Sequence, residues 1–70
     1  MEGLASVGAA RRKSLALTQA DAAALAGVSE RFVREVEGDK KSLRLDKLVA
    51  LLDVLGLELV SRVREVGDGR

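Results

Sequence analysis

Two arginines one helical turn apart, Arg31 and Arg34, are the residues of this sequence best suited to recognising another molecule through hydrogen bonds. Ser29 and Glu30 stand just before Arg31, so these polar side chains open one predicted helix. An arginine guanidinium matches the O6 and N7 acceptors of guanine, and a glutamate accepts from cytosine N4. Together the four side chains are placed to address a DNA major groove. The alternative for each arginine is a solvated side chain or an ion pair within the helix, such as Glu30 with Arg34.

Further cations lie around this segment. Lys40, Lys41 and Arg44 follow it and are expected to neutralise DNA phosphates, which gives affinity without sequence information. An ordinary charged loop is the alternative. Between Arg11 and Lys47, nine Lys and Arg stand against six Asp and Glu, a net charge of +3, whereas the rest of the chain has three against five, a net −2. A basic middle is typical of a nucleic-acid-binding face, although a solvated charged surface explains it about as often.

The residues that catalysis most often uses are missing. The chain has no Cys, His or Tyr and no glycine-rich phosphate loop, and its carboxylates are dispersed among Lys and Arg at helix-surface spacing. We therefore expect that the protein is not an enzyme and that it has no catalytic residue, metal site or cofactor. The longest apolar region, residues 48–60, is interrupted by Asp53 and Glu58, so neither a membrane span nor a signal peptide is indicated. These features predict a soluble intracellular protein without disulfides.

Two short helices joined at a glycine must position the arginines. Thr18 is the expected cap of a helix that runs to about Ala26, and Ser29 caps the next helix, which runs to Gly38. Helices joined by about three residues, with Gly27 in the left-handed conformation, cross steeply and form a helix-turn-helix unit. Counted from Gln19, the positions that such a crossing restricts carry residues of suitable size: Ala23, Gly27, Val28, Val33 and Val36. An ordinary helical hairpin is the alternative.

Apolar spacing predicts one helix before this unit and one after it. The first ends near Leu15, is weakened by about 1 kcal/mol by Gly8 in its interior, and has an apolar face formed by Leu4, Val7 and Leu15. The last follows Ser42, its expected cap, and ends at Gly56. Its apolar face is wider than a small domain needs and consists of Leu45, Leu48, Val49, Leu51, Leu52 and Leu55.

The segment from Leu57 to Val66 alternates in the manner of a β-strand. A lone strand is not stable, so we expect it to pair with the same strand of a second copy and to close a homodimer. The residues expected to form this dimer contact are Leu57, Leu59, Val60, Ser61 and Val63. A helical extension or a frayed tail is the alternative.

The segment "LTQADAAALAGVSERFVREVEG", residues 17–38, resembles the lambda-repressor-like (XRE-type) helix-turn-helix proteins. The continuation "LRLDKLVALLDVLGLEL", residues 43–59, is most similar to the HipB-type antitoxins that partner HipA-type kinase toxins. The resemblance covers about residues 7–59. Ala22 departs from it by standing where the family usually carries Leu, which suggests a thinner core. Lys41 stands where such antitoxins often carry Pro, which adds a charge near the expected DNA face.

The resemblance also implies roles for residues outside the recognition helix. Gln19 matches the family position that grips a DNA phosphate at the start of the second helix, where backbone amides and the helix dipole also favour an anion. Thr18, the cap next to it, is also expected to contact DNA. Arg12 and Glu37 match a pair that joins the first helix to the third inside the domain, so both are assigned to structure. The residues that flank Arg12 on other faces are expected to be exposed and to touch phosphate: Arg11 and Lys13.

The sequence thus predicts an all-α fold, a compact four-helix lambda-repressor-like domain over residues 1–70, with a C-terminal β-strand at about 57–66 that pairs between subunits and a flexible tail at 67–70. The expected function is a sequence-specific repressor that binds a palindromic double-stranded operator as a homodimer in the bacterial cytoplasm, associated with the nucleoid. The resemblance implies that it is the antitoxin of a HipBA-type module, autoregulating its operon and binding a HipA-type kinase toxin. The alternatives are a stand-alone phage-type or metabolic repressor, and a toxin-neutralising module with little DNA role.

Overall fold

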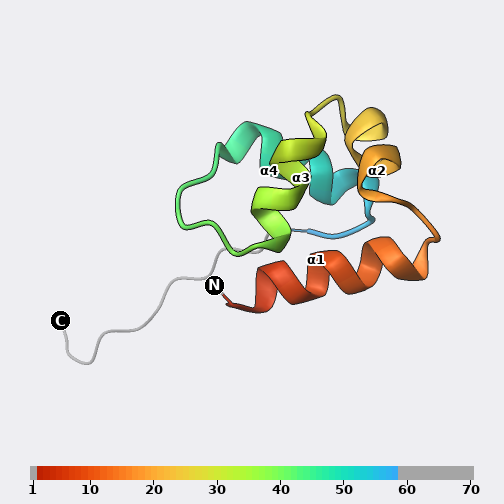
Figure 1. Ribbon diagram of the computed structural model, residues 1–70, viewed down its shortest axis with the longest axis horizontal. Helices are drawn as coiled ribbons and strands as arrows, with labels where there is room; N and C mark the ends of the chain where they lie inside the picture. The colour runs from red at the N-terminus through yellow and green to blue at the C-terminus, as the bar shows by residue number, and fades with distance from the viewer. Residues whose placement is uncertain (1, 59–70) are drawn as a thin grey trace, which may run out of the picture.

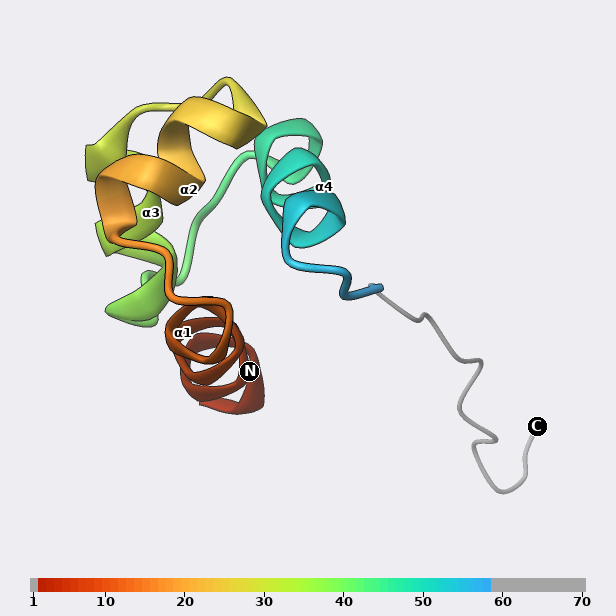
Figure 2. The same ribbon diagram turned by 90° about the vertical axis from the view of Figure 1, so that its right-hand side faces the viewer.

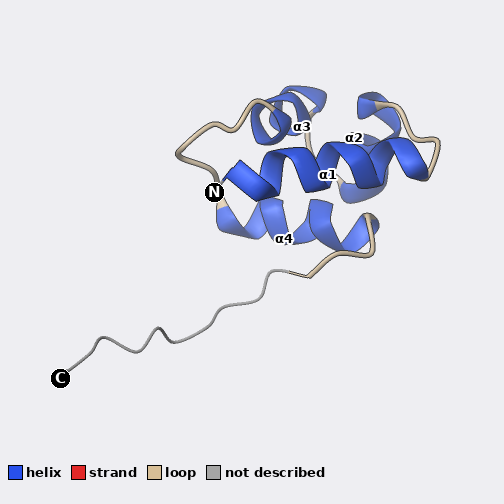
Figure 3. Ribbon diagram, turned by 90° about the horizontal axis from the view of Figure 1, so that it is seen from below, coloured by secondary structure: helices blue, strands red, loops and turns tan. Residues whose placement is uncertain are grey.

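The computed structural model describes residues 2–58, and each regular element in that range is an α-helix (Figure 1). The helices are α1 (Glu2–Ser14), α2 (Gln19–Ala26), α3 (Glu30–Glu37) and α4 (Leu45–Val54), so the four expected helices are confirmed. Viewed along α1, the pair α2 and α3 lies to one side and α4 to the other (Figure 2). From below, α1 crosses in front of the other helices (Figure 3). None of the described helices is long and apolar enough to cross a bilayer.

The core is small and built from α2, α3 and α4. Its buried side chains are Ala22, Ala23, Phe32, Val33, Val36, Leu48, Leu51, Leu52 and Leu55. Ala22 has no exposed surface, because it lies on α2, which packs against both α3 and α4. An alanine methyl group at this position buries less apolar surface than a leucine side chain would. Each Å² of buried apolar surface stabilises the fold by about 25 cal/mol. The core is therefore thin, as the alanine at this position suggests.

Capping hydroxyls and a glycine fix the connection from α2 to α3. Thr18 Oγ1 accepts a hydrogen bond from the backbone N–H of Asp21 at 2.9 Å, and Asp21 Oδ2 accepts one from the Thr18 N–H at 3.0 Å, which completes a capping box. Ser29 Oγ accepts from the Phe32 N–H at 3.0 Å. Gly27 ends α2 in the left-handed conformation, with φ of 71° and ψ of 32°. The caps and the glycine turn expected from the sequence are confirmed.

The expected apolar face of α1 is wrong for Val7 and Leu15, which are exposed, and holds for Leu4, which is half-buried against the core. The side of α1 that faces the other helices also buries Ala5, Gly8 and Arg12. Apolar spacing could not find this side because it carries a methyl group, a glycine and a charged side chain that has a partner on another helix.

The start of α4 also differs from expectation, because Arg44 is its N-cap and makes no capping hydrogen bond with its side chain. Ser42 therefore does not cap the helix. Of the expected strand, Leu57 and Glu58 lie in neither helix nor strand. Residues 59–66, and the expected tail at 67–70, lie outside the described residues, so the strand stays a prediction.

The turn generates a test with a matched control. Gly27→Ala forces an alanine to φ of 71° with no steric contact within 4 Å of the new methyl group, so the cost is backbone strain alone, about 1 kcal/mol of unfolding free energy. Gly8→Ala, inside α1 and also without a contact within 4 Å, should stabilise by about 0.5 to 1 kcal/mol. Urea unfolding followed by circular dichroism measures both. If both substitutions changed the unfolding free energy with the same sign, the result would contradict the left-handed conformation assigned to Gly27.

Candidate nucleic-acid interface

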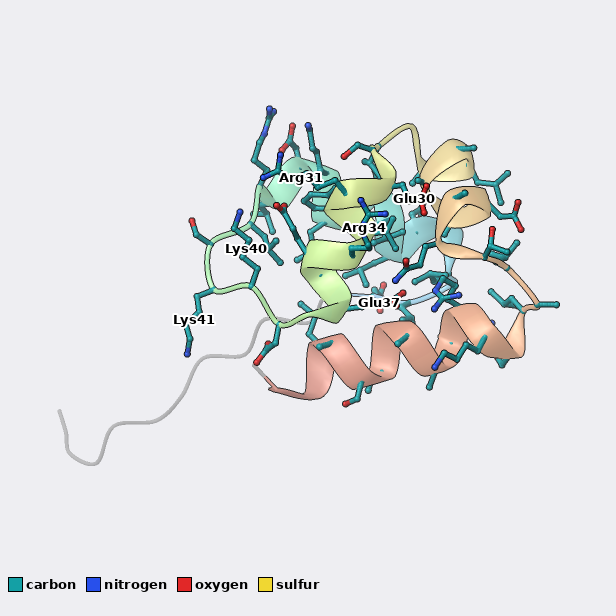
Figure 4. All side chains as sticks on the ribbon, in the orientation of Figure 1. Glu30, Arg31, Arg34, Glu37, Lys40 and Lys41 are labelled. Atoms are coloured by element: carbon teal, nitrogen blue, oxygen red, sulfur yellow. The ribbon has the colours of Figure 1, made fainter. Side chains whose placement is uncertain are left out.

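One side of α3 presents the charged side chains of Glu30, Arg31 and Arg34 to solvent (Figure 4). The Arg31 side chain is 80% exposed and the Arg34 side chain 55% exposed, with Glu30 beside them. Phe32 and Val33 occupy the opposite face and are buried in the core. Because burial of these two fixes the rotation of the helix, the arginines have a defined outward direction.

Each arginine of α3 is paired with a glutamate one turn away. Arg34 Nη1 lies 3.2 Å from Glu30 Oε2, and Arg31 Nε lies 3.3 Å from Glu35 Oε2. The same oxygen of Glu35 lies 3.2 Å from Lys40 Nζ, and the hydrogen bond from Lys40 lowers the pKa of the Glu35 carboxyl below its ordinary value. Exposed ion pairs are worth at most about 1 kcal/mol, so these arginines can exchange their glutamates for a stronger partner.

A cleft of about 260 Å³ opens between α3 and the start of α4. Its polar lining consists of Ser29, Arg31, Glu35, Lys40, Ser42, Arg44 and Lys47, and we call it the basic cleft. Four of these side chains are cationic and one is a carboxylate. A concave surface with an excess of cations concentrates positive potential and favours an anion such as a phosphate group.

Lys47 is the candidate binding residue that the sequence pattern did not single out. It lies on the first turn of α4, three residues after Arg44, and both line the basic cleft. That spacing, which places two side chains on one helix face, was the available signal. Arg44 also pairs with Asp46, at 2.6 Å between Nη2 and Oδ2. Lys41 lies outside the basic cleft, lines a hollow beside Leu4, and has no ion pair among the described residues.

A buried ion pair joins α1 to the end of α3. Arg12 donates from Nε to Glu37 Oε2 at 2.7 Å and from Nη2 to Glu37 Oε1 at 3.1 Å. Its third contact runs from Nη1 to the Leu17 carbonyl at 2.7 Å. The two side chains are only 11% and 12% exposed. The hydrogen bond from Arg12 is the main cause that lowers the pKa of Glu37 below its ordinary value.

Gln19 belongs to the same network, because its Nε2 donates to Glu37 Oε1 at 3.1 Å. This contact holds the Gln19 side chain at the N-terminal end of α2, where it keeps a second N–H and its carbonyl oxygen for other partners. Thr18 and Ser29 use their hydroxyl oxygens as acceptors in the two caps, so each hydroxyl retains a hydrogen to donate. The Gln19 and Thr18 side chains therefore retain hydrogen-bond donors for a phosphate, and the phosphate contact expected of them stays a prediction.

The two cations that flank Arg12 differ in their surroundings. Arg11 donates from Nε to the Leu55 carbonyl at 2.8 Å, which ties α1 to the C-terminal end of α4, where the helix dipole favours a cation. Lys13 is exposed. Of the expected dimer residues, Leu57 is half-buried against the core, and the others lie outside the described residues: Leu59, Val60, Ser61 and Val63.

Comparison with known proteins agrees with this geometry. The sequence model of the family HTH_3, described as "Helix-turn-helix", matches residues 9–61, which contain α2, α3 and α4 and the second part of α1. No curated protein matches the chain.

The buried pair of Arg12 and Glu37 predicts how the free energy of unfolding depends on pH. The pKa of Glu37 in the folded protein lies below its ordinary value of 4.5, so the unfolded chain binds the proton more readily, and stability present above pH 4.5 is lost as the pH falls below it. Glu37→Gln leaves Arg12 without its charge partner, so the free energy of unfolding at pH 7 should fall by about 3 kcal/mol and lose part of its acid dependence. Urea unfolding at a series of pH values measures both effects.

Asp39→Asn is the charge-matched control, since Asp39 is an exposed carboxylate without an ion pair among the described residues, and asparagine readily adopts its φ of 60°. It should change stability by less than about 0.5 kcal/mol. A Glu37→Gln variant as stable as the parent at pH 7 would show that the pair does not support the fold.

Proposed function

Because the chain belongs to the helix-turn-helix family HTH_3, of the lambda-repressor-like (XRE) type, we propose that it is a sequence-specific repressor that reads its operator with α3. Membership of this family makes the protein a DNA-binding transcription regulator. The observation that carries the finer proposal is the outward face of α3, where Arg31 and Arg34 are exposed beside Glu30 while the other face is fixed in the core. An α-helix of this kind enters the major groove, where arginine selects guanine.

The surroundings of α3 support this mode of binding. Lys40 and Lys41 lie on one side of α3 and α2 lies on the other (Figure 4). A helix in the major groove has a phosphate backbone on either side, so the N-terminal end of α2, with Thr18 and Gln19, meets one backbone and the lysines meet the other. In this proposal Arg44 and Lys47 add phosphate contacts from the basic cleft.

Base and phosphate contacts are separable by mutation. Arg31→Ala should cost about 1 to 3 kcal/mol of operator binding free energy and relax the preference at one base pair, because a bidentate base contact is lost. Lys41→Ala should weaken binding to operator and random duplexes alike and reduce the slope of log affinity against log salt by about 1. The operator is first selected from genome fragments with the purified protein, and fluorescence anisotropy then measures both variants. Identical effects of the two substitutions on both duplexes would refute the division of roles.

We propose that the protein binds DNA as a two-fold dimer. The apolar face of α4 supports this, because Leu45 and Val49 are exposed although they belong to the same helix that supplies the core. Val49 also lines a shallow groove of about 180 Å³, together with Leu52, Asp53, Leu57 and Glu58. The chain continues from this groove into residues 59–66, the predicted strand. A second copy that covers the groove and pairs the two strands would place two recognition helices on the half-sites of a palindrome.

Sedimentation velocity of the full chain at micromolar concentration tests the dimer, which should sediment with twice the 7.4 kDa mass of one chain. Val49→Asp places a charge in the proposed interface and should shift the protein to the monomer and weaken operator binding. Leu25→Asp is the matched control, since Leu25 is an exposed leucine of α2, and it should leave the dimer intact. A monomeric parent with full operator affinity would refute the proposal.

The resemblance of residues 43–59 to HipB-type antitoxins supports a second role. The same segment forms α4 with its exposed Leu45 and Val49, an apolar surface of the kind that partner proteins bind. In this role the protein neutralises a HipA-type kinase toxin and represses the operon that encodes both. A kinase-like reading frame beside the gene, whose product co-purifies with the protein, supports this role. A neighbouring phage or metabolic gene without such a frame favours a stand-alone repressor.

A further inference from the structure

Glu35 is the carboxylate of the basic cleft. Its Oε2 atom lies 3.3 Å from Arg31 Nε and 3.2 Å from Lys40 Nζ, so one oxygen holds two of the four cations that line the cleft. The side chain is 24% exposed, which leaves it reachable from solvent and from a bound ligand. Glu30, the other glutamate paired with an arginine of α3, holds Arg34 alone and does not line the cleft.

We infer that Glu35 competes with DNA phosphate for the cations of the basic cleft and thereby determines how far the protein discriminates its operator from other DNA. The inference rests on the proposed function and assigns to Glu35 a role that does not require it to contact a base. A phosphate group and a carboxylate are alternative partners for the same ammonium and guanidinium groups.

The competition affects the two classes of DNA differently. A backbone phosphate of DNA of any sequence that enters the cleft must separate Lys40 and Arg31 from Glu35. The phosphate then lies close to the negative charge of the Glu35 carboxylate, which repels it. On random DNA only phosphate contacts repay that loss. On the operator Arg31 also gains a base partner, which compensates for the glutamate that it leaves. The carboxylate therefore weakens binding to random DNA more than binding to the operator.

The full-length chain and its Glu35→Gln variant test this, each on the selected operator and on a random duplex of equal length over a range of salt concentrations. Glu35→Gln keeps the shape of the side chain and removes its charge. Affinity for the random duplex should rise about tenfold and operator affinity by no more than about threefold, because both released cations become available to phosphate. The salt slope on the random duplex should become steeper by about 1.

Two further variants separate the proposed cause from a general change in charge. Asp68→Asn removes one negative charge from the predicted tail at 67–70 and should leave the ratio of the two affinities unchanged. Lys40→Met in the Glu35→Gln background removes a released cation and should cancel most of the gain on the random duplex. Thermal melting followed by circular dichroism verifies that each variant is folded.

The outcomes are distinguishable. Equal gains on the two duplexes, or an unchanged salt slope, would overturn the inference while leaving the proposed function intact. Retention of the gain in the Lys40→Met double variant would also overturn it, because the released lysine would not be its source. A parent protein that prefers no sequence would overturn the proposed function, and the inference with it.

Discussion

A charged arginine can be buried beside a small core only if its charge is paired and its nitrogens are hydrogen-bonded, and Arg12, which donates one bond from each of its three guanidinium nitrogens, meets that condition. Two hydrogen bonds join the side chains, and the third contact of Arg12 goes to the Leu17 carbonyl. Since Arg12 lies on α1, Glu37 ends α3 and Gln19 begins α2, the network joins three helices at one point. The rest of the fold depends on this point because α1 offers little apolar surface of its own.

The same network links stability to the binding face. Gln19 is held by Glu37 at the start of α2, and Glu37 ends the helix that carries the outward Arg31 and Arg34. The position of the N-terminal end of α2 relative to α3 is therefore set by buried hydrogen bonds, together with the left-handed turn at Gly27. A binding surface supported in this way is already organised before DNA arrives, so less conformational entropy is lost on binding.

Most cations of the outward face already have an anionic partner within the protein, although cations remain in excess. Arg31, Arg34 and Lys40 each have a glutamate partner on α3, and Arg44 has Asp46. Such pairs contribute little to folding because both partners are solvated. In the proposed mode of binding, each paired cation exchanges one anion for another when DNA binds, whereas Lys41 and Lys47 have no ion pair to break among the described residues. A surface of this kind favours partners that offer more than negative charge.

The sequence by itself determined the elements of this protein. The caps Thr18 and Ser29, the left-handed Gly27 and the apolar spacing of α3 depend on residues close together in the chain, so local rules were sufficient. The resemblance to a known family supplied the pairing of Arg12 with Glu37, which spacing alone could not supply because the residues are 25 positions apart.

Only the tertiary structure decided which surfaces meet. The buried face of α1 follows from a partner on α3 and not from its own apolar residues, so Val7 and Leu15 were misplaced. Lys47 joined the basic cleft, and Arg11 bonded to the end of α4, because helix packing brought distant segments together. The physical reason is that sequence spacing identifies ion pairs within one helix but not the partner of a charged side chain on another helix. The place of such a side chain is fixed by whichever opposite charge or carbonyl the packing of the helices brings within hydrogen-bond distance.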